Sequence, residues 1–418
     1  MAAGGRHIQT VRTRGALAAL LVAVLLSACG RSGDPGDRDV STGDSPTTTA
    51  ESEPSPSADN GEWIAMADPP ASLAPGGPAV WTGSHVIVWG GGAFVQGSSP
   101  IGGGAYDPAA NTWEELPEAP VPAPDGHTAV WTGREVLYWG GAESSRNVER
   151  RVQGTAVAYD PAAKTWRRIA PAPIPMRTFH EAVWTGTEMV IWGGVTECCP
   201  IDSVIHDKTA AAYDPTTDTW RELANVPPPW SGDDGPAVTV SHGGDVFVWR
   251  NGELGRYSVA EDSWRSLGGE PADPNAPGGN IITTGGPVAI GTLVGDALFL
   301  WIGGGRATDG RVFALPGAKE KTVADAGQLT GFAPLLTGAS DAIFATDFDY
   351  DDTEPGEGSG LWRYDIASDK WEALPEPRAE IGAGAFPVWT GRELVVLPGF
   401  VPKDEGSERA TGAVFRRR

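Results

Sequence analysis

One unit of about fifty residues dominates this sequence, and it occurs three times in succession. Each copy contains Ala-Val-Trp-Thr-Gly, then Trp-Gly-Gly, then Ala-Tyr-Asp-Pro, then Thr-Trp, and the copies begin at Ala79, Ala129 and Ala182. Each unit is built from short apolar runs separated by glycine turns. The repeat therefore predicts a β-structure assembled from identical supersecondary units stacked side by side.

The pattern of apolar runs and turn residues in each copy predicts four short strands. Thr-Gly between the first two apolar runs predicts a hairpin, because glycine readily adopts the positive φ that such turns need. Gly-Gly after the second run permits a neighbouring backbone to approach closely. Asp-Pro after the third run predicts a turn, since the residue before proline is kept out of the helical conformation. The tryptophan of the fourth run is large and flat enough to fill the wedge between adjacent sheets.

The order Gly-Gly, Tyr, Trp resembles the kelch repeat, most clearly over residues 77–224. The resemblance implies a β-propeller in which each repeat forms one blade. Later copies depart from the pattern at Arg250-Asn251 and Ala345-Thr346, where Gly-Gly is expected, and at Phe313 and Val323, where the aromatic residues are expected. The seventh copy ends at Ala413-Val414-Phe415 without a fourth strand.

A segment that matches the missing strand lies at the other end of the chain. Glu62 to Met66 carries Trp63 where the fourth strand carries its tryptophan. Pairing it with the last repeat would close the ring and remove an exposed sheet edge. We therefore predict an all-β fold, a seven-bladed kelch-type β-propeller over residues 61–418 whose last blade is closed by the N-terminal strand. Six blades is the alternative, if the fifth or sixth copy is one irregular insertion.

Residues 1–29 have the features of a lipoprotein signal peptide. Three arginines precede an apolar run from Ala16 to Leu26, which is short for a membrane-spanning helix. Leu26-Ser27-Ala28-Cys29 resembles a bacterial lipobox, and the resemblance implies that Cys29 is lipid-modified and becomes the mature N-terminus. The alternative is an ordinary secretory signal with an incidental cysteine. The predicted location is the extracytoplasmic side of the cell membrane, with the membrane contacted through the lipid on Cys29.

Residues 30–60 are mostly Ser, Thr, Pro, Gly, Asp and Glu, which predicts a disordered linker between the anchor and the propeller. The formal net charge of the chain is −23. A nucleic-acid partner is therefore not expected, because phosphate binding needs a basic surface. The sequence predicts no cofactor.

In the predicted topology, the turns within the two hairpins of each blade lie on one face and are short. The connections between the second and third strands, and from each blade to the next, lie on the other face and are long and variable. We call these the short-turn face and the long-loop face. Long loops on a rigid scaffold are where binding groups concentrate, so we expect ligand binding on the long-loop face.

Arg177 and His180 on this face match the Arg-x-x-His pattern that kelch blades carry before the first strand, and His127 holds the equivalent position one repeat earlier. Two interpretations are open. The side chains tie neighbouring loops and blades together, or they bind a carboxylate or a sugar hydroxyl near the mouth of the central channel.

Three further groups on long connections are candidates. Cys198 and Cys199 are adjacent and are expected to be oxidised outside the cytoplasm. A vicinal disulfide, two free thiols and pairing between chains are the alternatives, and the disulfide would either stiffen the loop or line a ligand pocket. Trp230 with Asp233 and Asp234 offers a ring and carboxylates to a sugar. Asp347, Asp349 and Asp351 form a weak calcium candidate without the EF-hand pattern, with a solvated loop as the alternative, and no other metal site is expected.

Three classes of function compete: a surface-displayed propeller that binds a glycan or an envelope protein, a sugar-processing enzyme, and a structural module. The kelch resemblance brings two enzyme precedents, a copper radical oxidase and a sialic-acid mutarotase. The oxidase needs a Cys–Tyr crosslink that the vicinal cysteines do not supply. A mutarotase or epimerase needs only an acid/base group, for which His127, His180, Arg177 and Glu181 are weak candidates. No nucleophile elbow or phosphate loop is present, so binding is favoured over catalysis.

Overall fold

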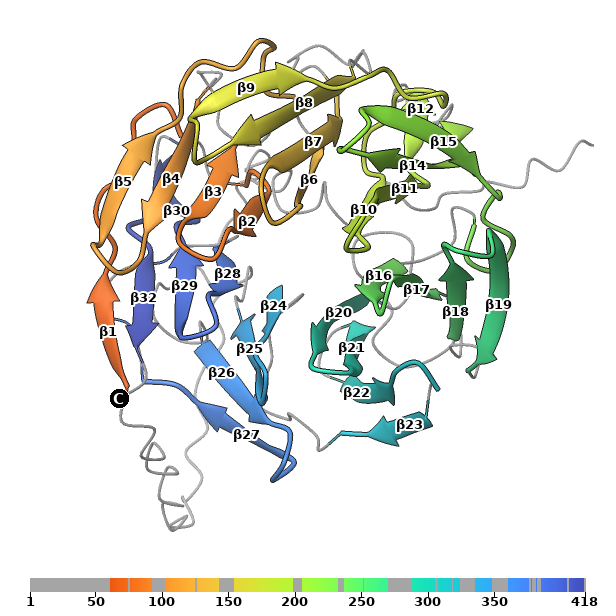
Figure 1. The fold of residues 1–418 in the computed structure, drawn as a ribbon. Helices are drawn as coiled ribbons and strands as arrows, with labels where there is room; N and C mark the ends of the chain where they lie inside the picture. The colour runs from red at the N-terminus through yellow and green to blue at the C-terminus, as the bar shows by residue number, and fades with distance from the viewer. Residues whose placement is uncertain are drawn as a thin grey trace, which may run out of the picture.

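The structure is a computed structural model that describes residues 61–73, 76–91, 102–124, 126–142, 154–197, 205–231, 237–250, 252–269, 288–304, 307–317, 319–323, 335–347, 360–375, 377, 381, 385–403 and 406–416. All its secondary structure is β, and its seven four-stranded antiparallel sheets are arranged as a ring (Figure 1). Within these residues there is no helix with the length and apolarity needed to cross a membrane.

Blades 1 to 3 are the three clear repeats, and each runs from the ring axis outward in chain order. Blade 1 is β2 (Ala79–Trp81), β3 (Val86–Trp89), β4 (Gly103–Asp107) and β5 (Thr112–Glu115). Blade 2 is β6 (Thr128–Trp131), β7 (Val136–Gly140), β8 (Thr155–Asp160) and β9 (Thr165–Arg168). Blade 3 is β10 (Glu181–Trp184), β11 (Met189–Trp192), β14 (Ala210–Asp214) and β15 (Thr219–Leu223).

The divergent repeats form complete blades as well. Blade 4 is β16 (Ala237–His242), β17 (Asp245–Arg250), β18 (Glu253–Ser258) and β19 (Ser263–Gly268). Blade 5 is β20 (Val288–Val294), β21 (Ala297–Gly304), β22 (Ala307–Ala314) and β23 (Lys319–Thr322). Blade 6 is β24 (Leu335–Gly338), β25 (Ala342–Asp347), β26 (Gly360–Asp365) and β27 (Lys370–Ala373). The prediction of seven blades is confirmed, because the fifth and sixth repeats each form a four-stranded sheet.

Blade 7 is closed by the N-terminal strand, as predicted. Its strand order is β28 (Phe386–Trp389), β29 (Glu393–Leu397), β32 (Ala413–Arg416) and β1 (Glu62–Ala65). Trp63 pairs with Phe415 in this register, and their rings lie 5.0 Å apart. The two ends of the folded chain therefore meet in one sheet.

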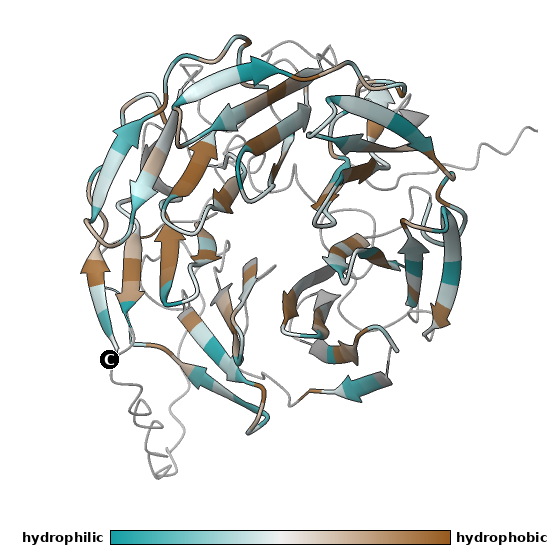
Figure 2. Ribbon diagram, viewed as in Figure 1, coloured by the Kyte–Doolittle hydropathy of each residue, from teal (hydrophilic) through white to brown (hydrophobic). Residues whose placement is uncertain are grey.

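The core lies between the blades. The described residues form seven hydrophobic clusters, each built from the facing sheets of two neighbouring blades. The second strands of blades 1 to 3 are buried along their length, whereas the outermost strands of blades 1 and 2 carry only partly buried and exposed residues. Figure 2 shows the same gradient in blades 1 to 3, with hydrophobic second strands and hydrophilic outermost strands. Because each sheet buries both faces against a neighbour, burial of apolar surface stabilises the ring as a whole.

The Thr-Gly turns form as predicted. In blade 2, Thr132 Oγ1 donates to the Glu135 carbonyl at 2.9 Å and accepts from the Glu135 amide at 2.9 Å, while Gly133 has a φ of 91°. The same arrangement recurs at Thr82, Thr185 and Thr390. The short hydroxyl side chain thus completes a turn whose next residue must be glycine.

The repeated Tyr and Trp of blade 3 link it to blade 2 at the outer rim. Tyr213 donates to Asp218 Oδ1 at 2.5 Å, and the same oxygen accepts from the Ala170 amide of blade 2 at 3.0 Å. Trp220 Nε1 donates to the Ala170 carbonyl at 2.7 Å. Asp218 has a φ of 53°, which Asp and Asn tolerate better than most residues. These side chains therefore hold the outer rims of neighbouring blades together.

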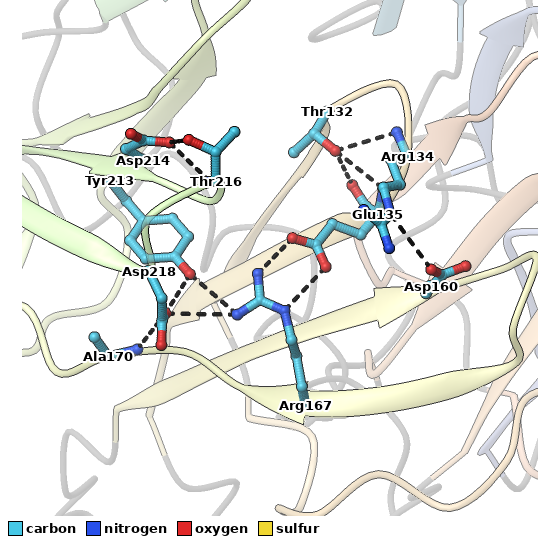
Figure 3. A network of polar contacts seen from close by, with 10 residues as sticks. All are labelled: Thr132, Arg134, Glu135, Asp160, Arg167, Ala170, Tyr213, Asp214, Thr216 and Asp218. Carbon is cyan, nitrogen blue, oxygen red and sulfur yellow. Dashed lines mark hydrogen bonds and ion pairs between the residues drawn. The ribbon is translucent and has the colours of Figure 1, made fainter.

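An arginine adds to this link on the short-turn face of blades 2 and 3 (Figure 3). The Arg167 guanidinium is ion-paired with Glu135, and its Nη1 donates to the Tyr213 hydroxyl at 3.1 Å. Glu135 and Arg167 belong to blade 2, whereas Tyr213 belongs to blade 3. Arg167 thus joins the short-turn ends of blades 2 and 3.

The long-loop face carries structure that the repeat does not explain. A hairpin of β12 (Val195–Glu197) and β13 (Ile205–His206) lies between the second and third strands of blade 3. A second hairpin, β30 (Phe400–Lys403) and β31 (Gly406–Arg409), occupies the same position in blade 7. Both are inserted on one face, so the two faces of the ring are unequal.

Candidate functional site

The residues singled out on blades 2 to 4 lie where the innermost strands begin, on the long-loop face. Arg177 and His180 immediately precede β10, Glu181 is its first residue, and His127 precedes β6. The structure therefore brings four of the predicted residues to one end of two adjacent blades. Their contacts decide what each can do.

The Gly-Gly pairs make room for the histidines. A Cβ added at Gly90 would lie 2.7 Å from His127 Cε1, and one added at Gly140 would lie 2.3 Å from His180 Cε1. Both glycines have positive φ. The end of each second strand and the histidine of the next blade thus form one packing unit, which explains why the two features occur together in the sequence.

His127 is buried between blades 1 and 2. Its Nδ1 lies 2.7 Å from the Pro124 carbonyl and its Nε2 lies 3.2 Å from the Trp89 carbonyl of blade 1. Its ring also contacts the Trp89 ring edge-on at 5.3 Å. Burial lowers the pKa of His127 to about 4, so the ring is neutral near pH 7.

His180 occupies the equivalent position between blades 2 and 3. Its Nε2 lies 2.8 Å from Thr128 Oγ1, and its ring contacts Trp139 edge-on at 4.8 Å. Burial, together with the positive charge of Arg177, lowers the pKa of His180 to about 3. Such a ring is poorly placed to exchange protons with a ligand near neutral pH. These contacts favour the interpretation that both histidines join blades.

Arg177 is fully buried. Its guanidinium lies 3.1 Å from Asp207 Oδ1 and donates to the Gly193 and Thr209 carbonyls at 3.0 and 3.1 Å. It also donates to Thr209 Oγ1 at 2.7 Å and to the Pro175 carbonyl at 3.0 Å. Its donors are engaged in fixing the connections around blade 3, so Arg177 acts there as a structural residue.

Asp207 and Thr209 were not singled out from the sequence. Thr209 donates to Asp207 Oδ1 through its amide at 2.7 Å, in the Asx-type arrangement that Asp-x-Thr favours. This motif, downstream of an arginine in a loop, is the signal that could have identified the partner of Arg177.

Glu181 differs from its neighbours because its carboxylate makes no hydrogen bond or ion pair with a described residue, and its side chain is only partly buried. It lies on the same side of β10 as Val183, which packs toward blade 4. Burial raises the pKa of Glu181 to about 7, and the positive charge of Arg250 on blade 4 opposes this shift. A carboxyl group that titrates near neutral pH can donate and accept protons.

Trp230 is buried, with 5% of its surface exposed. Its ring stacks on Trp264 with centroids 5.6 Å apart, and it fills the space beside Gly255 where a side chain would be. Its Nε1 donates to the Glu253 carbonyl at 3.2 Å, and its own carbonyl accepts from Arg250 Nη1 at 3.0 Å. The ring therefore packs within blade 4, which leaves little of it to stack on a sugar.

Several predicted residues lie outside the described residues: Cys29, Cys198, Cys199, Asp233, Asp234, Asp349 and Asp351. Asp347 ends β25, and only its backbone is described. The predictions of lipidation, of a vicinal disulfide and of a calcium site stay predictions. Among the described residues, no group of three or more His, Cys, Asp or Glu is placed to hold a metal ion.

Comparison with known proteins agrees with the fold. Residues 76–277 match the model of the KLHDC2/KLHL20/DRC7 Kelch-repeats domain. A solved structure of a fungal alcohol oxidase of the AA5 family in complex with copper superimposes with a TM-score of 0.61 and 13% sequence identity, covering 85% of this chain and 76% of the oxidase. At this identity the similarity concerns the fold alone. No curated protein matches the sequence.

Proposed function

We propose a binding function for this chain, which is a kelch-repeat β-propeller. It is held by lipid on Cys29 to the extracytoplasmic side of the cell membrane, and it binds a glycan or an envelope protein through its long-loop face. The single observation that carries the proposal is the inequality of the two faces.

The short-turn face has the same turn structure and similar ion pairs in several blades. Its Thr-Gly turns have the same hydrogen bonds in blades 1, 2, 3 and 7, and arginine–carboxylate pairs recur next to them in blades 2, 3 and 7. The long-loop face carries two inserted hairpins, the exposed Phe386, and a Glu181 carboxyl group that makes no hydrogen bond or ion pair with a described residue. Differences between repeats on a common scaffold are where specific recognition is expected.

The sequence supports the anchor. A basic and apolar leader ends at Cys29, and the linker over residues 30–60 would separate the lipid from β1, where the ring closes. Intact-mass measurement of the mature chain tests this. A diacylglyceryl adduct on an N-terminal Cys29 is expected, and a mature chain without the adduct overturns the anchor while leaving the binding proposal intact.

Binding is tested with the full chain on a glycan array and in crosslinking to intact cell envelopes. Saturable binding that Phe386→Ala or Glu181→Gln weakens, without loss of thermal stability, supports the long-loop face. Binding unaffected by both variants places recognition elsewhere. Phe386 and Glu181 begin inner strands of blades 7 and 3, so the pair samples two parts of the face.

A mutarotase- or epimerase-like activity on sugars is the second candidate, favoured by the carboxyl group of Glu181 with its pKa raised to about 7. It predicts faster anomer exchange of reducing sugars, measured by NMR, in the presence of the chain. Glu181→Gln should abolish the acceleration. Exchange at the uncatalysed rate, or acceleration that survives the substitution, contradicts this candidate.

A further inference from the structure

Four tryptophans occupy the same position on consecutive blades. Trp389, Trp81, Trp131 and Trp184 are the last residues of the innermost strands of blades 7, 1, 2 and 3, and each pairs with the first or second residue of the next strand. They lie at the short-turn end of the ring axis, opposite the long-loop face. We call this set the tryptophan arc.

The indoles of the arc are partly exposed, unlike the tryptophans of the second strands. Trp89 and Trp139 are at most 1% exposed, whereas all four arc residues keep part of their surface accessible. Each packs one side of its ring against a cluster between blades. The arc therefore exposes aromatic surface on side chains that packing already holds in place, so a ligand would not have to order them on binding.

The N–H groups of this set are also distinctive. The outer-strand tryptophans Trp113, Trp166 and Trp220 donate to carbonyl oxygens of the preceding blade. By contrast, Nε1 of Trp81, Trp131 and Trp184 makes no hydrogen bond within the described chain and is not among the fully buried unpaired atoms. Three donors thus reach water from one side of the axis.

The other half of the ring is built differently at this position. In the first strands of blades 4, 5 and 6, the register position that tryptophan holds in the arc is occupied by Ser241, Leu293 and Gly338, respectively. Gly338 has no space for a side chain, since a Cβ there would lie 1.9 Å from the Leu293 carbonyl oxygen. At this register position the described blades therefore carry tryptophan on one side of the axis and small or aliphatic residues on the other.

The charged residues next to the arc indicate which class of ligand could bind to its aromatic surface. Arg134 and Arg392, in the turns next to Trp131 and Trp389, are exposed, and Arg134 Nε lies 3.7 Å from Asp160 Oδ2. The carboxylates of the same turns are engaged: Glu135 with Arg167, Glu188 with Arg221 and Glu393 with Arg416. In the turns beside the arc a cationic ligand would meet exposed arginines and carboxylates that are already ion-paired, and the exposed Asp296 lies in the turn of blade 5 across the axis. A quaternary ammonium group is therefore disfavoured at the arc.

We propose that the tryptophan arc is a saccharide-binding site, separate from the long-loop face. The indole faces would stack on the C–H groups of a sugar ring, while the indole N–H and arginine N–H groups donate to its hydroxyl oxygens. Neither neutral sugars nor uronic acids carry a positive charge, so both fit the site. The proposal does not depend on the long-loop face having a ligand of its own.

The test uses the full chain with ¹⁵N-labelled indoles and a panel of free neutral and uronic-acid oligosaccharides, with tetramethylammonium as the cationic probe. We expect saturable shifts of the arc indole N–H signals with at least one oligosaccharide. Each signal is assigned by its loss in a single Trp→Leu variant. Shifts confined to other indoles, preferential binding of tetramethylammonium, or no saccharide binding overturns the proposal.

Variants give a second readout. Trp131→Leu and Trp184→Leu keep an apolar side chain, and leucine already occupies this position in blade 5 as Leu293. Each should weaken saccharide binding about tenfold or more, equivalent to about 1.4 kcal/mol. Trp113→Leu is the matched control, because Trp113 is a partly buried tryptophan on β5, the outermost strand of blade 1, away from the arc. Saccharide affinity that falls as much with Trp113→Leu as with the arc variants overturns the proposal, whether or not the long-loop proposal stands.

Discussion

The junction between blades 2 and 3 and the junction between blades 3 and 4 are neighbours, and blade 3 contributes to both. In the first, His180 contacts Thr128 and Trp139, and the outer tryptophan donates to the Ala170 carbonyl. In the second, no histidine takes that position, the outer Trp264 leaves its Nε1 buried without a partner, and Trp230 packs on it instead.

The difference shows how the repeat relates to function. Where the repeat is intact, its polar side chains are engaged in joining blades. Where the repeat pattern is missing, hydrophobic stacking replaces some of those bonds. Between blades 3 and 4, the Glu181 carboxyl group has no hydrogen-bond or ion-pair partner within the part of the chain that the structure describes. Chemistry is therefore to be sought at the irregular junction.

The largest effect is expected from removing the buried cation that fixes blade 3. Arg177→Met would leave Asp207 without its ion pair and three carbonyl oxygens without their donor, so the free energy of unfolding should fall by about 3–5 kcal/mol. Arg134→Met is the control, since Arg134 is 85% exposed and its loss should cost under about 0.5 kcal/mol. Equal effects in denaturant unfolding would contradict the structural role of Arg177.

The two junctions should respond differently to a methyl group at equivalent glycines. Gly140→Ala would place its Cβ 2.3 Å from His180 Cε1, whereas a Cβ at Gly193 meets no atom within 4 Å. Both glycines have positive φ, so both variants pay about 1–2 kcal/mol of backbone strain. The clash should bring the total for Gly140→Ala to about 3 kcal/mol or more. Similar thermal midpoints for the two variants would show that the histidine does not require the glycine.

A smaller effect, with a pH signature, is expected at Glu181. Its pKa is about 7 in the folded chain against an ordinary value of 4.5, so the fold keeps a proton that the unfolded chain releases. The resulting stability is complete below pH 4.5 and is lost as the pH rises to about 7.

Glu181→Gln should therefore match the parent at pH 4 and exceed its unfolding free energy by about 1–3 kcal/mol at pH 8. Glu188→Gln is the control, because Glu188 is ion-paired with Arg221 and its loss should be slightly destabilising at pH 8. A Glu181→Gln difference that does not change with pH would rule out the shifted carboxyl group.

The smallest effect on stability is expected at the tryptophans of the outermost strands of blades 3 and 4. Trp220→Phe removes a donor from the Ala170 carbonyl, whereas Trp264→Phe removes an N–H that has no partner. Both lose similar packing area, so Trp220→Phe should be more destabilising by about 1 kcal/mol. A Trp264→Phe variant that loses as much as Trp220→Phe would mean that the two junctions are equivalent.

The fold could be predicted from the sequence because each repeated residue has a local cause. Thr-Gly closes a turn and Gly-Gly admits a histidine, and Trp63 identified the strand that closes the ring. The divergent blades 4 and 6 keep part of the repeat pattern as well, because Tyr257 and Tyr364 each donate a hydrogen bond to the aspartate five residues later.

The site was less accessible to such reasoning. Whether Trp230 faces a ligand or Trp264 depends on the path of a loop, and the buried pairing of Arg177 depends on Asp207, which lies 30 residues later and carries no repeat signal. Glu181 and the four arc tryptophans are ordinary strand residues by pattern. The folded ring is needed to place Glu181 at the long-loop end of the axis and the four tryptophans at the short-turn end.

The closure of blade 7 by β1 sets the order in which this protein can mature. The sheet pairs Glu62 with Arg416, so the ring stays open until β32 has been synthesised. In a chain exported N-terminus first, as proposed above, β1 would have no strand to pair with until β32 has followed it. A chain truncated before β32 would keep its first strand without that partner.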